Sequence, residues 1–113
     1  MLFRSEVLLI ANPRAAGDEE KRRAMDDITT LLLGALRAQG RVLIKLNVSD
    51  EKLKALLDVL PSMKAPTVSP LAEEGNYAVE TVVEKSAVNT LIPMLKAHGA
   101  TDILELPISK IVP

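Results

Sequence analysis

A proline-rich stretch at residues 60–71, LPSMKAPTVSPL, is the sequence feature that most constrains the fold. Each proline fixes its backbone φ angle and lacks an N–H donor, so Pro61 should end a helix and Pro66 should begin an extended segment. An apolar pattern of helical spacing precedes the stretch, and a run rich in β-branched residues follows it. The stretch therefore predicts a helix-to-strand connection, with Thr67 at the start of the strand.

Hydrophobic periodicity predicts a regular order of elements on both sides of this connection. Gly40 and Gly99 lie where left-handed residues commonly end helices, and Ser49 and Ser86 lie where side chains commonly cap helix starts. Pro93 falls inside the last helix, where we expect a tolerated kink because the apolar stripe continues past it. The predicted strands are 42–47, 67–69, 77–83 and 102–106, and the predicted helices are 49–60 and 86–98.

The resulting order, β-α-β-β-α-β, is that of the α+β ferredoxin-like sandwich, which PII-type proteins also use. Residues 1–40 are organised differently: the apolar run 7–11 predicts a buried strand with no partner nearby, and Asp18 should cap a helix that ends near Gly40. We therefore expect an extra strand and a linking helix in residues 1–40, and a ferredoxin-like domain in residues 41–113.

Composition excludes several classes of function. Lys and Arg total 14 and Asp and Glu total 15, so no charge excess favours binding to nucleic acid or a membrane. Cysteine is absent and His98 is the single histidine, which argues against thiol chemistry and His-rich metal sites. No apolar run approaches the roughly 18 residues of a membrane span, and the first residues do not look like a signal peptide. We expect a cytoplasmic domain.

Enzyme motifs are also absent from the sequence. There is no glycine-rich phosphate loop and no pair of histidines at metal-binding spacing. Some ferredoxin-like proteins are acylphosphatases, which need an anion-binding loop with an arginine after the first strand. Here residues 47–51 read NVSDE, without an arginine, so a small hydrolase is disfavoured.

Polar residues cluster at the predicted strand ends. Asn47 ends the first strand, Thr67 begins the second, and Thr101 and Asp102 begin the fourth. Together with backbone amides, such groups could hold a small zwitterion. They could equally be ordinary turn and cap residues, and the spacing alone leaves both interpretations open.

Six segments of the sequence are specific enough to indicate a family. They are KLNV (45–48), LP (60–61), APTVSPLA (65–72), AVETVV (78–83), LKAHGA (95–100) and LPISKIVP (106–113). In these segments the chain closely resembles the C-terminal regulatory domain of long-form ATP phosphoribosyltransferase. The resemblance runs from about Ser5 to the end, and its most specific parts are the proline-rich block and the C-terminal segment.

The resemblance implies a role in the first step of histidine biosynthesis, with L-histidine bound as feedback inhibitor by an oligomeric, ferredoxin-like domain. Several family members have aspartate at the position of Asn47, so we expect the amide here to bind without charge assistance. The ligand positions carried over from the family are Asn47, Met63, Thr67, Val82 and Asp102.

The resemblance also implies that residues 1–40 are the tail of a catalytic portion that this chain lacks. We therefore expect no catalysis by the chain alone, and no cofactor in it, since the magnesium of the family enzyme belongs to the catalytic portion. The expected partners are L-histidine, that catalytic portion and further copies of the chain, as a trimer. The alternative is a PII-like structural trimerisation module without ligand, which titration with L-histidine separates from the first hypothesis.

Overall fold

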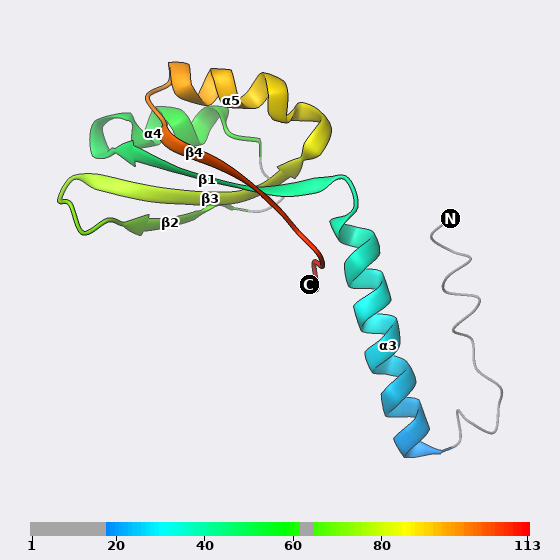
Figure 1. Ribbon diagram of the computed structural model, residues 1–113. Coiled ribbons are helices and arrows are strands. Elements are labelled where there is room, and N and C mark those ends of the chain that lie inside the picture. Colours follow the sequence, from blue (N-terminus) through cyan, green and yellow to red (C-terminus); the bar gives the residue numbers. More distant parts are fainter. Residues whose placement is uncertain (1–17, 62–64) are drawn as a thin grey trace. The chain divides into compact units, whose positions relative to one another are not determined.

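The computed structural model describes residues 18–61 and 65–113 (Figure 1). Residues 40–108 form one compact unit, and the long helix α3 groups with residues 109–113 in a second. The predicted strand 7–11 lies outside the described residues. The elements are α3 (Glu19–Ala38), β1 (Arg41–Ser49), α4 (Asp50–Val59), β2 (Thr67–Pro70), β3 (Asn76–Glu84), a 3-10 turn (Lys85–Ala87), α5 (Val88–Ala97) and β4 (Thr101–Pro107).

The larger unit has the predicted ferredoxin-like fold. Its four strands form one sheet in the order β2-β3-β1-β4, and every neighbouring pair is antiparallel. Helices α4 and α5 cover one face of this sheet (Figure 1). The edge strands are therefore β2 and β4, which lie on opposite sides of the β3–β1 pair.

The core lies between the sheet and the two helices. Along β1, buried and half-buried residues alternate, as expected for a strand with one covered face. Ile44 and Leu46 of β1 and Leu56 of α4 are at most 1% exposed. Burial of each such side chain contributes about 1.5–3 kcal/mol, and the buried core is aliphatic, with Tyr77 packed against it. Other members of the core are Val42, Val48, Leu60, Val79, Val83, Val88, Leu91, Leu95 and Ala100.

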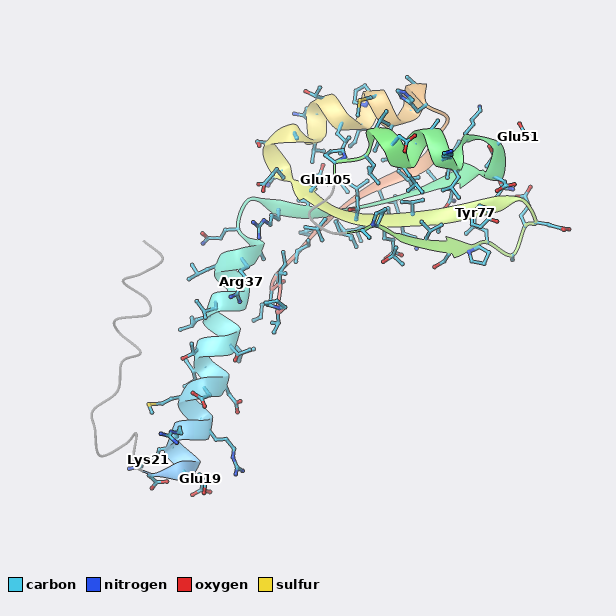
Figure 2. All side chains as sticks on the ribbon, turned by 180° about the vertical axis from the view of Figure 1, so that it is seen from behind. Glu19, Lys21, Arg37, Glu51, Tyr77 and Glu105 are labelled. Carbon is cyan, nitrogen blue, oxygen red and sulfur yellow. The ribbon has the colours of Figure 1, made fainter. Side chains whose placement is uncertain are left out.

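The ends of the elements follow the predicted turn chemistry in most places. Gly40 and Gly99 adopt φ angles of 72° and 95°, which are the left-handed values predicted for residues that end helices. The polar connection from β2 to β3 closes through a hydrogen bond from the Leu71 N–H to the Asn76 carbonyl at 2.9 Å. Glu51, in the first turn of α4, and Tyr77, near the start of β3, lie at the same end of the domain (Figure 2).

The prediction that Ser86 caps the second helix was wrong. Ser86 lies within the 3-10 turn Lys85–Ala87, and the helix begins at Val88 with Ala87 in the cap position. The turn is held by the Lys85 N–H, which donates to the Gly40 carbonyl at 2.7 Å. Ser49 does occupy the cap position of α4, but its side chain makes no capping hydrogen bond.

The smaller unit pairs α3 with the last residues of the chain. The Asp18 carboxylate accepts hydrogen bonds from the backbone N–H groups of Glu20 at 3.0 Å and Lys21 at 3.3 Å, as predicted for a helix cap. The Ile111 N–H donates to the Gly34 carbonyl at 2.9 Å. Gly34 is buried, and its lack of a side chain leaves room for Val112.

Candidate functional site

The sheet face that α4 and α5 leave uncovered carries the polar residues that the sequence singled out. Directly paired residues of antiparallel strands lie on the same face, so the register identifies this surface. We call it the open face. Its residues are Leu43, Lys45 and Asn47 of β1, Thr67 and Ser69 of β2, Ala78, Glu80 and Val82 of β3, and Thr101, Leu104 and Leu106 of β4.

Asn47 and Asp102, from β1 and β4, come together at one side of the open face. The Asn47 side-chain amide donates to the Asp102 carboxylate, with 3.4 Å between Nδ2 and Oδ2. The hydroxyl of Thr101 donates to the Asn47 backbone carbonyl, also at 3.4 Å. Three polar groups from neighbouring strands therefore converge, whereas Thr67, which the sequence grouped with them at strand ends, lies on the opposite edge strand.

A β-bulge in β4 brings Asp102 to this position. Lys45 and Asn47 of β1 are two residues apart, but their partners, Leu104 and Thr101, are three apart. The extra residue is accommodated at Asp102, whose φ angle of 50° lies in the left-handed region. Aspartate tolerates this region better than most residues with side chains, and bulges commonly redirect a side chain. The alternation of a regular strand therefore does not determine which face Asp102 occupies.

Thr67 lies on the same face but on the opposite edge of the sheet. It pairs with Glu80 of β3, and both it and the rest of β2 are exposed to solvent. Val82 pairs with Leu43 and is half-buried. Met63 lies outside the described residues. The structure thus brings Asn47 and Asp102 together and keeps Thr67 and Val82 on the same face, away from that pair.

Sequence reasoning missed an ion pair in the centre of the open face. The Lys45 ammonium lies 3.8 Å from the Glu80 carboxylate, and both side chains are less than half exposed, at 45% and 41%. The two residues are cross-strand partners in the row that also contains Thr67 and Leu104. The sequence does show that Lys45 and Glu80 alternate with apolar residues in predicted strands. It does not show that the two residues face each other, because that requires the register of β1 against β3.

The open face is also notably apolar for an uncovered surface. Leu104 and Leu106 of β4 are 51% and 38% exposed, and Leu43 and Val82 are half-buried beside them. Exposed apolar residues next to an ion pair and polar strand ends are typical of a surface that another molecule covers. The face therefore combines apolar contact area with hydrogen-bonding groups at two separate edges.

The described residues give no sign of a metal centre. Within 18–61 and 65–113, no three or more His, Cys, Asp or Glu side chains gather as they would to hold a metal ion, so these residues do not fit a magnesium site. In the same part of the chain, no helix is long and apolar enough to cross a membrane.

A four-stranded antiparallel sheet with two helices on one face defines a ferredoxin-like domain, here with a mixed polar and apolar open face. The chain belongs to the family described as HisG, C-terminal domain, which it matches over residues 38–110. The sequence-based resemblance is thereby confirmed.

Relatives extend the match to nearly the whole chain. An ATP phosphoribosyltransferase from Solibacter usitatus is 45% identical over 111 residues, which cover 98% of this chain and 38% of the relative. An ATP phosphoribosyltransferase from Desulforudis audaxviator is 43% identical over 113 residues, which cover 100% of this chain and 39% of the relative. The chain therefore spans about two fifths of the length of these relatives.

Proposed function

We propose that this chain is the regulatory domain of an ATP phosphoribosyltransferase, that it binds L-histidine as a feedback inhibitor of histidine biosynthesis, and that it supports oligomer assembly. The observation that carries the proposal is the match to the HisG C-terminal domain family over residues 38–110. It is supported by the open face, where Asn47, Thr67, Val82 and Asp102 all lie on or beside one uncovered surface.

The dimensions of the open face bear on how it would bind the amino acid. Thr67 and Asp102 lie on opposite edge strands, three strand spacings or about 14 Å apart. Free histidine is only a few covalent bonds long, roughly 7 Å at most. One ligand lying on one sheet therefore covers about half of the width between the two edges.

We infer that a second copy of the chain completes each histidine site. One copy contributes Thr67 from β2, and its neighbour contributes Asn47 and Asp102 from the opposite edge. Such a head-to-tail arrangement closes into a ring when the rotation between copies allows, and the expected ring is a trimer. Exposed Leu104 and Leu106 support this arrangement, because association would remove them from water.

Calorimetric titration of the purified chain with L-histidine, together with light scattering, tests the proposal. We expect saturable binding by an oligomer and a trimeric mass at micromolar concentration. Leu104→Lys places a charge on the exposed open face and should lower both the mass and the affinity, whereas Thr90→Lys, on an exposed position of α5, should change neither. A monomeric mass for the native chain contradicts the assembly role.

A mixing experiment tests whether the site is shared between copies. Thr67→Val and Asn47→Ala each damage one half of every site, so neither variant alone should bind L-histidine well. When the two are unfolded together and refolded as mixed oligomers, some interfaces regain an intact Thr67 opposite an intact Asn47. Recovery of tight sites supports sharing, and the absence of recovery restricts each site to one copy.

The structural alternative, a trimerisation module without ligand, draws on the same exposed leucines. It predicts the same oligomer mass and the same loss of mass in Leu104→Lys, but no heat with L-histidine. The titration alone therefore separates the two functions.

A further inference from the structure

We propose that residues 110–112 act as a strap, which lies across α3 at Gly34 and holds the C-terminal turns of that helix folded. The strap is a conformational device separate from the open face, and its contacts lie within the unit that groups α3 with residues 109–113. By the sequence-based resemblance, this helix links the domain to a catalytic portion. The strap would therefore keep the link helical where it approaches the domain.

The first support is a backbone hydrogen bond between the strap and the helix. The Ile111 N–H donates to the Gly34 carbonyl at 2.9 Å. A backbone carbonyl oxygen has two lone pairs, so this one can accept the bond in addition to the helical bond from residue 38. The strap is thus attached to a regular turn of α3 and does not depend on the unpaired carbonyls of the helix end.

The second support is the close fit at Gly34. A Cβ atom at this position would lie 3.0 Å from the Cγ2 atom of Val112, 3.4 Å from the Ile111 carbonyl oxygen and 3.5 Å from the Cβ atom of Lys110. The first of these distances is shorter than ordinary van der Waals contact between carbon atoms. The strap therefore fits closely against a residue without a side chain.

The third support is the place of Gly34 in the helix. Glycine is a poor helix former, because it loses more backbone freedom on folding than any other residue. Among the described residues of α3, Gly34 and Ala38, one turn apart, are the buried ones, whereas Ile28, Leu31 and Leu32 are 41% to 51% exposed. The helix is therefore covered at the turn where its sequence stabilises it least, and the strap lies at that turn.

Hydrogen exchange of the full chain tests the strap through two substitutions at one position. Ile111→Pro and Ile111→Ala both remove the isoleucine side chain, but only proline also removes the N–H donor. The amides of residues 35–38 should exchange about twofold to tenfold faster in Ile111→Pro than in Ile111→Ala, as expected for the net loss of one hydrogen bond. The amides of residues 22–25, at the other end of α3, should exchange alike in both variants.

A double-mutant cycle tests the side-chain contact independently. Alanine is a better helix former than glycine, so Gly34→Ala should stabilise α3 wherever the added Cβ atom finds room. In the native chain that atom meets Val112 Cγ2, and in a Val112→Ala background this contact is absent. Gly34→Ala should therefore slow exchange at residues 35–38 by at least about twofold more in the Val112→Ala background than in the native chain.

Two results overturn the proposal. Equal exchange at residues 35–38 in Ile111→Pro and Ile111→Ala shows that the hydrogen bond does not hold the helix. Equal effects of Gly34→Ala in the two backgrounds show that Val112 does not contact position 34. If Ile111→Pro raises exchange throughout the chain, including the amides of β1, the cycle alone decides, because its alanine variants keep every backbone donor.

Discussion

The aliphatic part of the Lys52 side chain, on α4, lies where Gly99 would carry a Cβ atom. Gly99 follows α5, and two hydrogen bonds close that helix end: Gly99 N–H to the Lys96 carbonyl at 3.1 Å, and Ala100 N–H to the Leu95 carbonyl at 3.0 Å. This is the Schellman arrangement, in which the left-handed residue reverses the chain. Lys52 therefore packs one helix against the end of the other.

A left-handed backbone costs about 1–2 kcal/mol for a residue that carries a Cβ atom. We predict that Gly99→Ala lowers the free energy of unfolding by more than this amount. The added Cβ must displace Lys52, so the full loss should exceed that of Gly75→Ala, where φ is 83° but no atom lies within 4 Å. Chemical denaturation of the two variants measures the difference. In a Lys52→Ala background the two glycine substitutions should cost the same, and a persistent difference would exclude the Lys52 contact as its cause.

The same region illustrates what the sequence could predict. A glycine directly after an apolar helical pattern marks a left-handed helix end, because local backbone sterics decide the matter. Gly40 and Gly99 were predicted on this basis and confirmed. The prediction that Ser86 caps a helix used the same local reasoning and was wrong. A 3-10 turn occupies that position, and the Lys85 N–H beside Ser86 donates to the distant Gly40 carbonyl.

The site depended on register, which a single sequence does not specify. The sequence placed Asn47, Thr67 and Asp102 at strand ends without indicating which of them meet, and the structure joins Asn47 to Asp102 while Thr67 lies on the opposite edge strand. The bulge at Asp102 was not predicted, because aspartate is common in many turns and gives no signal specific to a left-handed bulge. The Lys45–Glu80 pair likewise requires knowledge that β1 and β3 are neighbours in this register.

We predict that Asp18→Ala lowers the stability of the first turn of α3 by about 1 kcal/mol, because two backbone N–H groups lose their acceptor. Asp18→Ser should preserve most of the stability of this turn, since serine is also a good helix cap. Hydrogen exchange of the Glu20 and Lys21 amides measures the effect locally. Unchanged protection of these amides in Asp18→Ala would show that the cap does not stabilise the helix start.

We predict that the chain alone forms no phosphoribosyl-ATP from ATP and phosphoribosyl pyrophosphate, with or without magnesium. The prediction rests on the proposed regulatory role, because the chain spans only about two fifths of the length of the relatives named ATP phosphoribosyltransferase. A spectrophotometric assay of purified chain, free of host enzyme, checks this. Product formation in proportion to chain concentration would contradict the regulatory assignment.

The last prediction concerns Thr67, a proposed site residue on the edge strand opposite to that of Asp102. Thr67 follows Pro66, which favours an extended backbone at position 65 and fixes its own φ angle, and the structure has Thr67 as the first residue of β2. Its branched side chain has few rotamers, so the hydroxyl is directed rather than mobile. Valine keeps that shape but removes both a donor and an acceptor.

We expect Thr67→Val to leave the fold intact, because Thr67 is exposed and valine suits a strand. A ligand group facing the substituted position would lose its partner at a cost of about 1–3 kcal/mol, which is roughly a fivefold to hundredfold loss of affinity for L-histidine. Thr90→Val makes the same chemical change on an exposed position of α5 and should leave the affinity unchanged. Equal dissociation constants for Thr67→Val and the native chain would remove Thr67 from the site, and the site would then be confined to the β1–β4 side of the open face.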